Sequence, residues 1–504
     1  MESLNGLAEG LASLATLDNL LVILIATVIG LIGGIIPGVS GPMLVVVALP
    51  VTYAFDPTQA FIILTVLYAT SVYGGMVTAI LFRAPGTPES ALTVLDGYPM
   101  AQQGQAARAL GVGILSSGVG AIIATVGLIF LTPILASLAM SFSSAEFFAI
   151  ALLGLAIVAS LSSGQIGKGI FGVGLGILLG TVGNDPMTAQ QRLTFDSTGL
   201  ASGLEIVPVL IGLFAIPEVL RRGRLNSNRR FDANYGKVKV WTRENFKEVG
   251  PTTVRSGILG TVIGVLPGAG ATTTAVLGYT QAVKFAKIKE RFGKGDPRGI
   301  AGVESANNAG STGSLVPLFA LGIPGSATTA IMIGAFIMHG FQPGPNLMSS
   351  QSTFVYTVFA AILIANILAI LLSKPFINGV VRIINIPYSL LGGIILTFCV
   401  IGSFSLRNSI FDVGVMLAFG VLGYFLSSVN FPVATIILGF VLGPIAESNF
   451  RRALMMAGGD YTVFFTRPIT AVTLGLVVLI IAVPIVGTVM RRVRKTPVSE
   501  ALKV

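Results

Sequence analysis

Charged residues are scarce in this chain, and their scarcity excludes most soluble folds. Of the 504 residues, 10% are Asp, Glu, Lys or Arg and 53% are hydrophobic. Soluble domains usually carry about 25% charged residues. Apolar runs of membrane-spanning length recur along the whole chain, and they are continuous rather than alternating. Continuous runs are typical of membrane helices and not of transmembrane β-barrels, so we expect an all-α polytopic membrane protein.

Cysteine and histidine are nearly absent as well. The chain has one cysteine, Cys399, and one histidine, His339. A lone cysteine excludes an intramolecular disulfide framework and any cysteine-based metal cluster, and a lone histidine excludes a His-rich metal site. We therefore expect no resident cofactor or metal centre.

The N-terminus lacks the basic residues of a cleavable signal peptide. The first 19 residues carry three acidic residues and neither Lys nor Arg, whereas a signal peptide begins with a basic stretch. We expect an uncleaved periplasmic N-terminus, and the many short loops favour a multi-pass protein of a bacterial inner membrane.

The net charge of +10 is concentrated in three segments. Residues 221–250 hold nine Lys or Arg and three acidic residues, residues 284–298 hold six and two, and residues 491–504 hold five and one. Such segments lie in the cytoplasm under the positive-inside rule, which explains the charge without nucleic acid. The C-terminus is therefore expected in the cytoplasm.

Two apolar runs are interrupted by Pro and Gly. Residues 251–283 lie between two basic segments and are broken by "PGAG" at 267–270, which predicts a re-entrant hairpin that enters from the cytoplasm. Residues 20–53 have acidic flanks and are broken by "PGVSGP", which predicts a hairpin that enters from the periplasm. About 11 spanning helices account for the other apolar runs.

The two hairpins belong to a weak internal repeat. Pro37-Gly38 and Pro267-Gly268 lie 230 residues apart, "APGTPES" at 84–90 and "IPGSATT" at 323–329 lie 239 apart, and "FGVG" and "FDVG" lie 240 apart. The predicted division is a first transmembrane repeat, a basic cytoplasmic linker, a second, inverted repeat, and an additional C-terminal helix with a basic tail, at residues 1–220, 221–250, 251–446 and 447–504. Inverted repeats with broken helices are the signature of secondary transporters.

The breaks are the expected binding site. Broken helices expose N–H groups that suit anions and carbonyl groups that suit Na⁺. The candidate substrate or ion contacts are the glycine, hydroxyl and amide residues at the breaks, namely Gly38, Ser40, Gly41, Thr87, Gly268, Gly270, Thr272, Thr273, Asn307, Asn308, Ser311, Thr312, Ser326 and Thr328. Helix packing is the alternative role for the Asn pair. Glu304 and Glu146 are candidate proton or cation sites, with a cytoplasmic helix cap as the alternative for Glu304.

Four stretches resemble one known family. They are "IPGVSGPMLVVVALPVTYAFDPTQA" (36–60), "YGGMVTAILFRAPGTPESALTVLDGYPMAQQG" (73–104), "GVLPGAGATTTA" (264–275) and "GVESANNAGSTGSLVPLFALGIPGSATTAIMIGAF" (302–336). Together they resemble the large permease subunit of the tripartite tricarboxylate transporters, the TctA family, over essentially the entire chain. The first motif of that family often reads Pro-Gly-x-Gly-Gly. This chain has Ser40 at the first of the paired glycines, which makes Ser40 a candidate for tuning ligand binding.

The resemblance implies a cation-coupled importer of tricarboxylates, citrate among them, or of related carboxylates. Such a symporter couples uptake to Na⁺ or H⁺ and works with a small membrane subunit and a periplasmic solute-binding protein. It uses no ATP, in agreement with the lack of a G-x-x-x-x-G-K-[ST] motif here. It is not an enzyme.

Two other functions compete with this one. "GVSG" at 38–41 is also how some intramembrane serine proteases present their nucleophile, and Ser40 with His339 as base is the pair that such an enzyme would need. An anion channel is the third hypothesis.

Overall fold

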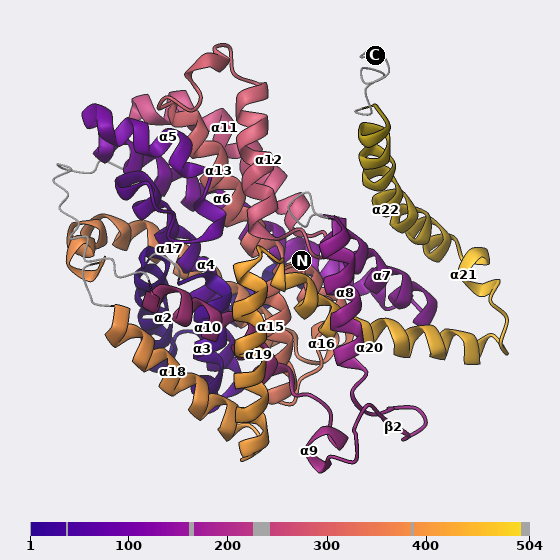
Figure 1. Cartoon of the computed structure of the whole chain (residues 1–504). Helices are drawn as coiled ribbons and strands as arrows, with labels where there is room; N and C mark the ends of the chain where they lie inside the picture. The colour runs from indigo at the N-terminus through magenta and orange to yellow at the C-terminus, as the bar shows by residue number, and fades with distance from the viewer. Residues whose placement is uncertain (1, 37–38, 161–165, 225–241, 385–387, 495–504) are drawn as a thin grey trace, which may run out of the picture. The chain divides into compact units, whose positions relative to one another are not determined.

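The computed structural model describes residues 2–36, 39–160, 166–224, 242–384 and 388–494. Over these residues the chain is almost entirely helical, with one two-stranded ribbon (Figure 1), which confirms the all-α polytopic fold class. The chain divides into two compact units, a larger one of residues 1–141 and 204–429 and a smaller one of residues 142–203 and 430–504.

The first part of the larger unit alternates long helices with short breaks. Its elements are α1 (Glu2–Ser13), α2 (Leu17–Ile35), α3 (Gly41–Thr52), α4 (Pro57–Phe82), the 3₁₀ turn η1 (Pro88–Ser90), α5 (Thr93–Met100), the π turn η2 (Ala101–Gln105) and α6 (Ala106–Ala139). The side chains of Thr16, Ser40 and Asp56 accept hydrogen bonds from first-turn N–H groups of α2, α3 and α4. These N-caps satisfy donors that a helix leaves unpaired, so they fix where each apolar helix begins.

The second part of the larger unit repeats this alternation. Its elements are α10 (Ile206–Arg224), α11 (Arg243–Gly264), α12 (Gly270–Lys284), η3 (Lys289–Arg291), α13 (Pro297–Gly313), α14 (Leu315–Leu321), α15 (Ala327–Met338), α16 (Pro345–Ser350), α17 (Ser352–Ile384), α18 (Tyr388–Ser405) and α19 (Ile410–Ser428). Thr242 caps α11, so the first arm of the hairpin predicted at 251–283 begins eight residues earlier, inside the predicted linker. Residues 225–241 of that linker lie outside the described residues.

The smaller unit combines segments from both halves of the sequence. It contains α7 (Ser144–Ser160), α8 (Ile166–Gly180), β1 (Gly183–Asn184), β2 (Gln191–Arg192), α9 (Thr198–Ala201), α20 (Val433–Met456), α21 (Val463–Thr466) and α22 (Pro468–Arg494). In it α20 packs along α8, where Gly176 and Gly439 let the two backbones approach closely. Within the larger unit α10 packs along α19 in a similar way, at Gly212 and Gly420.

Six helices of the described residues are long and apolar enough to cross a membrane. They are Leu17–Ile35, Pro57–Phe82, Thr93–Ala139, Ser352–Ser373, Ile410–Ser428 and Val433–Met456. Six further apolar helices are shorter, and the figure of about 11 spans stays a prediction. Large aliphatic side chains are exposed along several helices, for example Val472 at 65% and Val478 at 63% on α22. An exposed apolar helix face of this kind suits contact with lipid.

Two polar contacts of the larger unit mark the two ends of α4. Near its start, Gln59 Nε2 donates to Asn19 Oδ1 (3.3 Å) at the beginning of α2. Beyond its end, the Asp96 carboxylate accepts from the N–H groups of Gly295 and Asp296 (3.0 and 2.9 Å) just before α13. The ends of α2 and α3 that are not joined to each other therefore lie at the start of α4. The segment between α12 and α13 lies near the other end of α4.

Candidate functional site

α4 ends in a sharp turn that folds the chain back onto the helix. Arg83 adopts the left-handed conformation (φ 56°), and the N–H of Ala84 donates to the C=O of Thr78 (3.3 Å). This return bond spans six residues, one more than the bond of the Schellman motif, and it folds the chain back past the last turn of α4. The N–H of Gly86 then donates to the C=O of Gly75 (3.1 Å), so the Pro-Gly segment lies against α4. We call residues 83–90 the first break.

The helix pair α13–α14 ends in the same turn. Gly322 is left-handed (φ 70°), and the N–H of Ile323 donates to the C=O of Pro317 (3.2 Å). Gly325 lies against Ser314, so that a β-carbon added at Gly325 would collide with the Ser314 backbone. Each of these residues stands 239 positions after its counterpart in the first turn. We call residues 322–329 the second break.

The hydroxyl groups of Ser326 and Thr329 in the second break are hydrogen-bonded. Ser326 and Thr329 form a capping box at the start of α15, in which each side-chain oxygen accepts from the other residue's N–H (3.2 and 2.8 Å). The Tyr68 hydroxyl of α4 lies 3.3 Å from both the Ser326 and the Ser314 Oγ atoms. Thr328 is buried next to the same tyrosine. This arrangement provides neutral hydroxyl groups, to which no carboxylate of the described residues is hydrogen-bonded.

The hydroxyls of the first break have no hydrogen-bond partners. Thr87 and Ser90 stand where the second break has Ser326 and Thr329, yet Thr87 forms no cap and lies beside the Glu89 carboxylate, and neither hydroxyl has a partner of good hydrogen-bond geometry. Thr78 of α4 carries a third buried hydroxyl without a partner. All three side chains are at most 1% exposed, and they surround the close approach of Gly75 and Gly86. Buried polar groups without partners are costly unless a ligand or water satisfies them.

A buried carboxylate lies beside these hydroxyls. Glu304, in the middle of α13, is fully buried and accepts hydrogen bonds from Thr93 Oγ1, Ser117 Oγ (3.3 Å) and Asn307 Nδ2 (3.3 Å). The Ser90 hydroxyl also lies beside this carboxylate. Glu304 is therefore not a helix cap, and its role as a proton or cation site stays a prediction.

Each break is contacted by a helix from the other half of the unit. Asn307 of α13 donates from Nδ2 to the C=O of Glu89 in the first break (3.2 Å), as Tyr68 of α4 reaches Ser326 in the second. Tyr68 and Asn307 are themselves 239 residues apart. The Glu89 side chain is buried, and its Oε2 atom has no partner.

The other predicted residues of α13 follow Asn307 along the helix. Asn308 is buried and donates to the Asn307 Oδ1 atom (2.9 Å), whereas its own Oδ1 atom has no partner. Ser311 donates to the C=O of Asn308 (2.9 Å), and Thr312 is buried with an unpartnered hydroxyl. Asn308 and Thr312 lie one turn apart, so their unpartnered oxygens share a helix face.

The predicted residues of the hairpin tips are less uniformly buried. Gly268 and Gly270 both have positive φ (80° and 62°), which glycine adopts without strain, and Gly270 lies close to Ser326. Gly41 faces Ser71 and Tyr68. Among the threonines that follow, Thr272 is exposed and Thr273 is half-buried, and Gly38 lies outside the described residues.

The protease pair is not brought together. Ser40 caps the start of α3, where its Oγ accepts from the N–H of Met43 (3.4 Å). His339 lies at the other end of that helix, with Nε2 3.5 Å from the Thr52 hydroxyl. A helix of this length separates the two by about 18 Å, so His339 does not serve Ser40 as a base in this structure.

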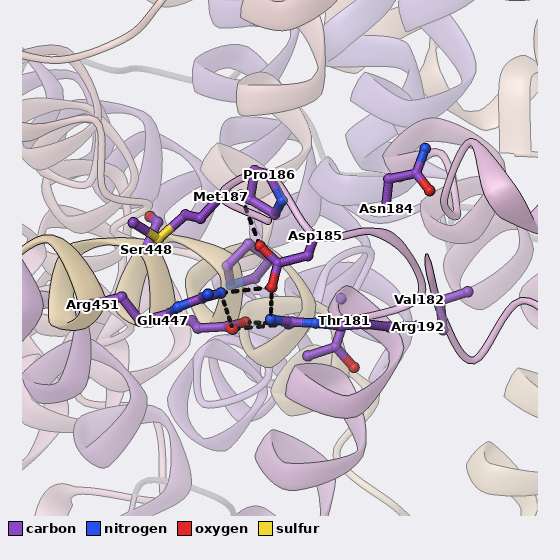
Figure 2. Close-up of a pocket in the computed structure, with 12 residues that line it drawn as sticks. Thr181, Val182, Asn184, Asp185, Pro186, Met187, Arg192, Glu447, Ser448 and Arg451 are labelled. Carbon is purple, nitrogen blue, oxygen red and sulfur yellow. Dashed lines mark hydrogen bonds and ion pairs between the residues drawn. The ribbon is translucent and has the colours of Figure 1, made fainter. Parts of the chain in front are cut away.

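The smaller unit holds a cavity of about 50 Å³ lined by charged side chains (Figure 2). Arg192 Nη1 lies 2.8 Å from Glu447, Arg451 Nη1 lies 2.7 Å from Asp185, and Arg192 also bonds Asp185. The bond from Arg451 is the main reason that the pKa of Asp185 lies well below its usual range. Because both arginines are paired, this network ties the 183–192 loop to α20 and offers an anion no unpaired cation.

Glu146, the other candidate cation site, is paired as well. Its carboxylate lies 2.6 Å from Arg467 Nε and accepts from the N–H and hydroxyl of Ser143 at the start of α7. An ion pair at a helix N-terminus accounts for this residue. In the described part of the chain no three His, Cys, Asp or Glu side chains form a group that could hold a metal.

The sequence did not reveal several residues of the buried cluster. Glu89 and Ser90 lie inside a motif that was identified as important, but only Thr87 was selected from it. Tyr68, Thr93 and Ser117 carry no local signal, because their partners stand 187 to 258 residues away. The repeat offset could have found Tyr68, which is the counterpart of Asn307.

Comparison with known proteins identifies the family. Residues 20–438 match the sequence model of the tripartite tricarboxylate transporter TctA family. An Agrobacterium vitis protein, "Uncharacterized 52.8 kDa protein in TAR-I ttuC' 3'region", is 36% identical over 485 residues, which cover 96% of each chain. Another from Agrobacterium vitis, "Uncharacterized protein in TAR-II ttuC' 3'region", is 42% identical over 217 residues, 43% of this chain and 90% of that protein. No solved structure matches. The chain belongs to the tripartite tricarboxylate transporter TctA family.

Proposed function

We propose that this protein is a cation-coupled importer of tricarboxylates or related carboxylates that works by alternating access. Family membership supports a permease subunit of a tricarboxylate transporter. The observation that carries the rest is the pair of helix breaks, each with unwound backbone and each contacted by a helix of the other half. Broken helices that meet in this way build the substrate and ion sites of secondary transporters.

The two halves are inverted repeats in this proposal. The equal spacing of 239 residues between the turns, and between Tyr68 and Asn307, supports a duplicated unit. The α2–α3 hairpin opens near the start of α4, whereas the segment that follows α12 is bound beyond the end of α4. Hairpins that open at opposite ends of one helix are what an inverted repeat requires.

The carboxylate substrate is assigned to the second break and the hairpin tips. Tyr68, Ser314, Ser326 and Thr328 place hydroxyl groups there, and the Gly270 backbone lies beside Ser326. Hydroxyl and backbone N–H donors can hold an anion without a cationic side chain. No carboxylate is hydrogen-bonded to these hydroxyls within the described residues, although the buried Glu89 carboxylate lies near enough to Tyr68 to act on it electrostatically.

The proposed partners follow from the tripartite family. The permease receives its substrate from a periplasmic solute-binding protein and acts with a small membrane subunit in a bacterial inner membrane. The N-terminus lies in the periplasm and the C-terminus in the cytoplasm. Cysteines introduced at Asp56 and Lys287, in a chain without Cys399, should be labelled from opposite sides, and labelling from one side only would refute the inverted repeat.

Uptake by the reconstituted tripartite system tests the proposal. Proteoliposomes with the small subunit and cognate binding protein should accumulate at least one labelled carboxylate from a panel that includes citrate, and only with an inward Na⁺ or H⁺ gradient. Ser326→Ala should reduce uptake, whereas Ser403→Ala, which removes a buried, unpartnered hydroxyl of α18, should not. Accumulation without any gradient, or none of any carboxylate, contradicts the proposal.

A further inference from the structure

The negative charge of Glu304 has no counterpart. In the described ranges, no Lys, Arg or His side chain pairs with this carboxylate, and the side chains bonded to it or facing it, those of Thr93, Ser117, Asn307 and Ser90, are all neutral. An ionised carboxylate buried in a membrane protein is costly unless a cation neutralises it.

The hydroxyls of the first break supply further oxygens next to this carboxylate. Ser90 lies beside Glu304, and its Oγ atom shares the space above Gly75 with Thr87 Oγ1. Both side chains are almost completely buried, and neither oxygen has a hydrogen-bond partner. The unpartnered atoms are thus oxygens, which a hard cation takes as ligands.

The second break shows that the backbone geometry of this turn does not by itself leave the two hydroxyls without hydrogen-bond partners. With the same turn and register, Ser326 and Thr329 satisfy each other in a capping box. The residue 239 positions before Glu304 is Thr65, whose hydroxyl donates to the C=O of Phe61 in its own helix (2.6 Å). The charge and the free oxygens therefore occur together at the first break and are both missing from the second.

We infer that the first break binds one Na⁺ ion, with the Glu304 carboxylate and the hydroxyl oxygens of Thr87 and Ser90 as ligands. This assignment rests on the proposed function, in which a cation drives uptake, and it names the site where that cation is held. A single proton on Glu304 would neutralise the carboxylate and could be shared with Ser90, but it would leave the Thr87 hydroxyl without a partner. A Na⁺ ion satisfies all three groups at once.

Thermal unfolding of the purified full-length protein tests the site without transport. NaCl should raise the unfolding temperature relative to choline chloride and KCl at equal ionic strength, because a ligand that binds only the folded state stabilises that state. Glu304→Gln should raise the Na⁺ concentration needed for half the shift by at least about tenfold, and Thr87→Val and Ser90→Ala should raise it several-fold.

Matched controls separate loss of a ligand from loss of a buried hydroxyl. Thr132→Val and Ser403→Ala remove hydroxyls that are also buried and unpartnered but belong to α6 and α18 and not to either break, and both should keep the full Na⁺ response. The assignment is overturned if wild type shows no Na⁺-specific shift, if protons alone give it, or if Glu304→Gln responds like wild type. If Glu304→Gln does not fold, binding of radioactive Na⁺ to Ser90→Ala tests the assignment instead, and binding as tight as in wild type overturns it.

This experiment and the uptake assay fail independently. A Na⁺ shift that depends on Glu304 in a protein that transports no carboxylate leaves the site standing and contradicts the proposed function. Na⁺-driven carboxylate uptake that Glu304→Gln does not alter supports the function and places the cation elsewhere.

Discussion

The first and second breaks share one backbone and differ in how their polar side chains are satisfied. Both begin with a left-handed residue and a return hydrogen bond that spans six residues, and both continue with Pro-Gly and a hydroxyl residue. At the second break two hydroxyls close a capping box, whereas the equivalent hydroxyls at the first break stay unpartnered beside a buried carboxylate. A duplicated turn can thus provide a closed, neutral site in one half and an open, anionic site in the other.

The largest effect is expected from removing the charge that distinguishes the two breaks. Glu304→Gln should lower Na⁺-driven uptake by about 10- to 100-fold, since a charge-assisted contact contributes about 1.5–3 kcal/mol. Thr65→Ala, at the equivalent position of α4, should change uptake less than about twofold. Initial rates in proteoliposomes measure both. Equal losses of uptake in Glu304→Gln and Thr65→Ala would mean that these equivalent positions of α13 and α4 contribute equally to transport.

A smaller effect is expected from the left-handed residue that ends each helix. Gly322→Ala should destabilise the protein by about 1–2 kcal/mol, because the substitution adds a β-carbon at positive φ that would also meet the Pro343 carbonyl. Arg83→Gly relieves the same strain at the first break and loses only a contact with the Tyr98 ring, so it should not destabilise. Unfolding temperatures of the two variants should move in different directions, and a cost for Arg83→Gly like that of Gly322→Ala would contradict the shared turn.

The smallest effect concerns the hydroxyls themselves. Ser326→Ala removes half of a capping box and should cost about 1 kcal/mol of stability. Thr87→Ala removes an oxygen with no partner and should change stability by less than about 0.5 kcal/mol in Na⁺-free buffer. Thermal unfolding in choline chloride gives the comparison. A loss of stability from Thr87→Ala as large as that from Ser326→Ala would show that the Thr87 hydroxyl has a hydrogen-bond partner in the absence of Na⁺.

The sequence predicted the positions of the breaks because Pro and Gly have fixed effects on a helix. The offset of 239 residues paired the two motifs before their shared turn was visible. The sequence could not predict which hydroxyls would meet, because this depends on tertiary contacts such as that of Thr93 with Glu304, 211 residues away. The sequence also could not predict which face of α12 is buried. Thr272 is exposed, whereas Thr274 is buried.

The hairpin bounds show a second limit of the sequence. The hydropathy pattern starts the second hairpin at 251, but the Thr242 cap starts α11 at Arg243, inside a basic segment. The helix can begin in a polar segment because the N-cap side chain satisfies a backbone N–H group at the helix start. A hydropathy pattern contains no information about that hydrogen bond. α11 therefore begins inside the segment predicted to be the cytoplasmic linker, whose extent stays a prediction.

Binding of radioactive Na⁺ to the purified full-length chain tests the central claim most directly. Wild type and Thr65→Ala should each bind a single ion per chain with saturation, and Glu304→Gln should lose this binding while it retains its fold. Binding that survives in Glu304→Gln, or that is lost in Thr65→Ala, would contradict the claim that only the first break is built for a cation.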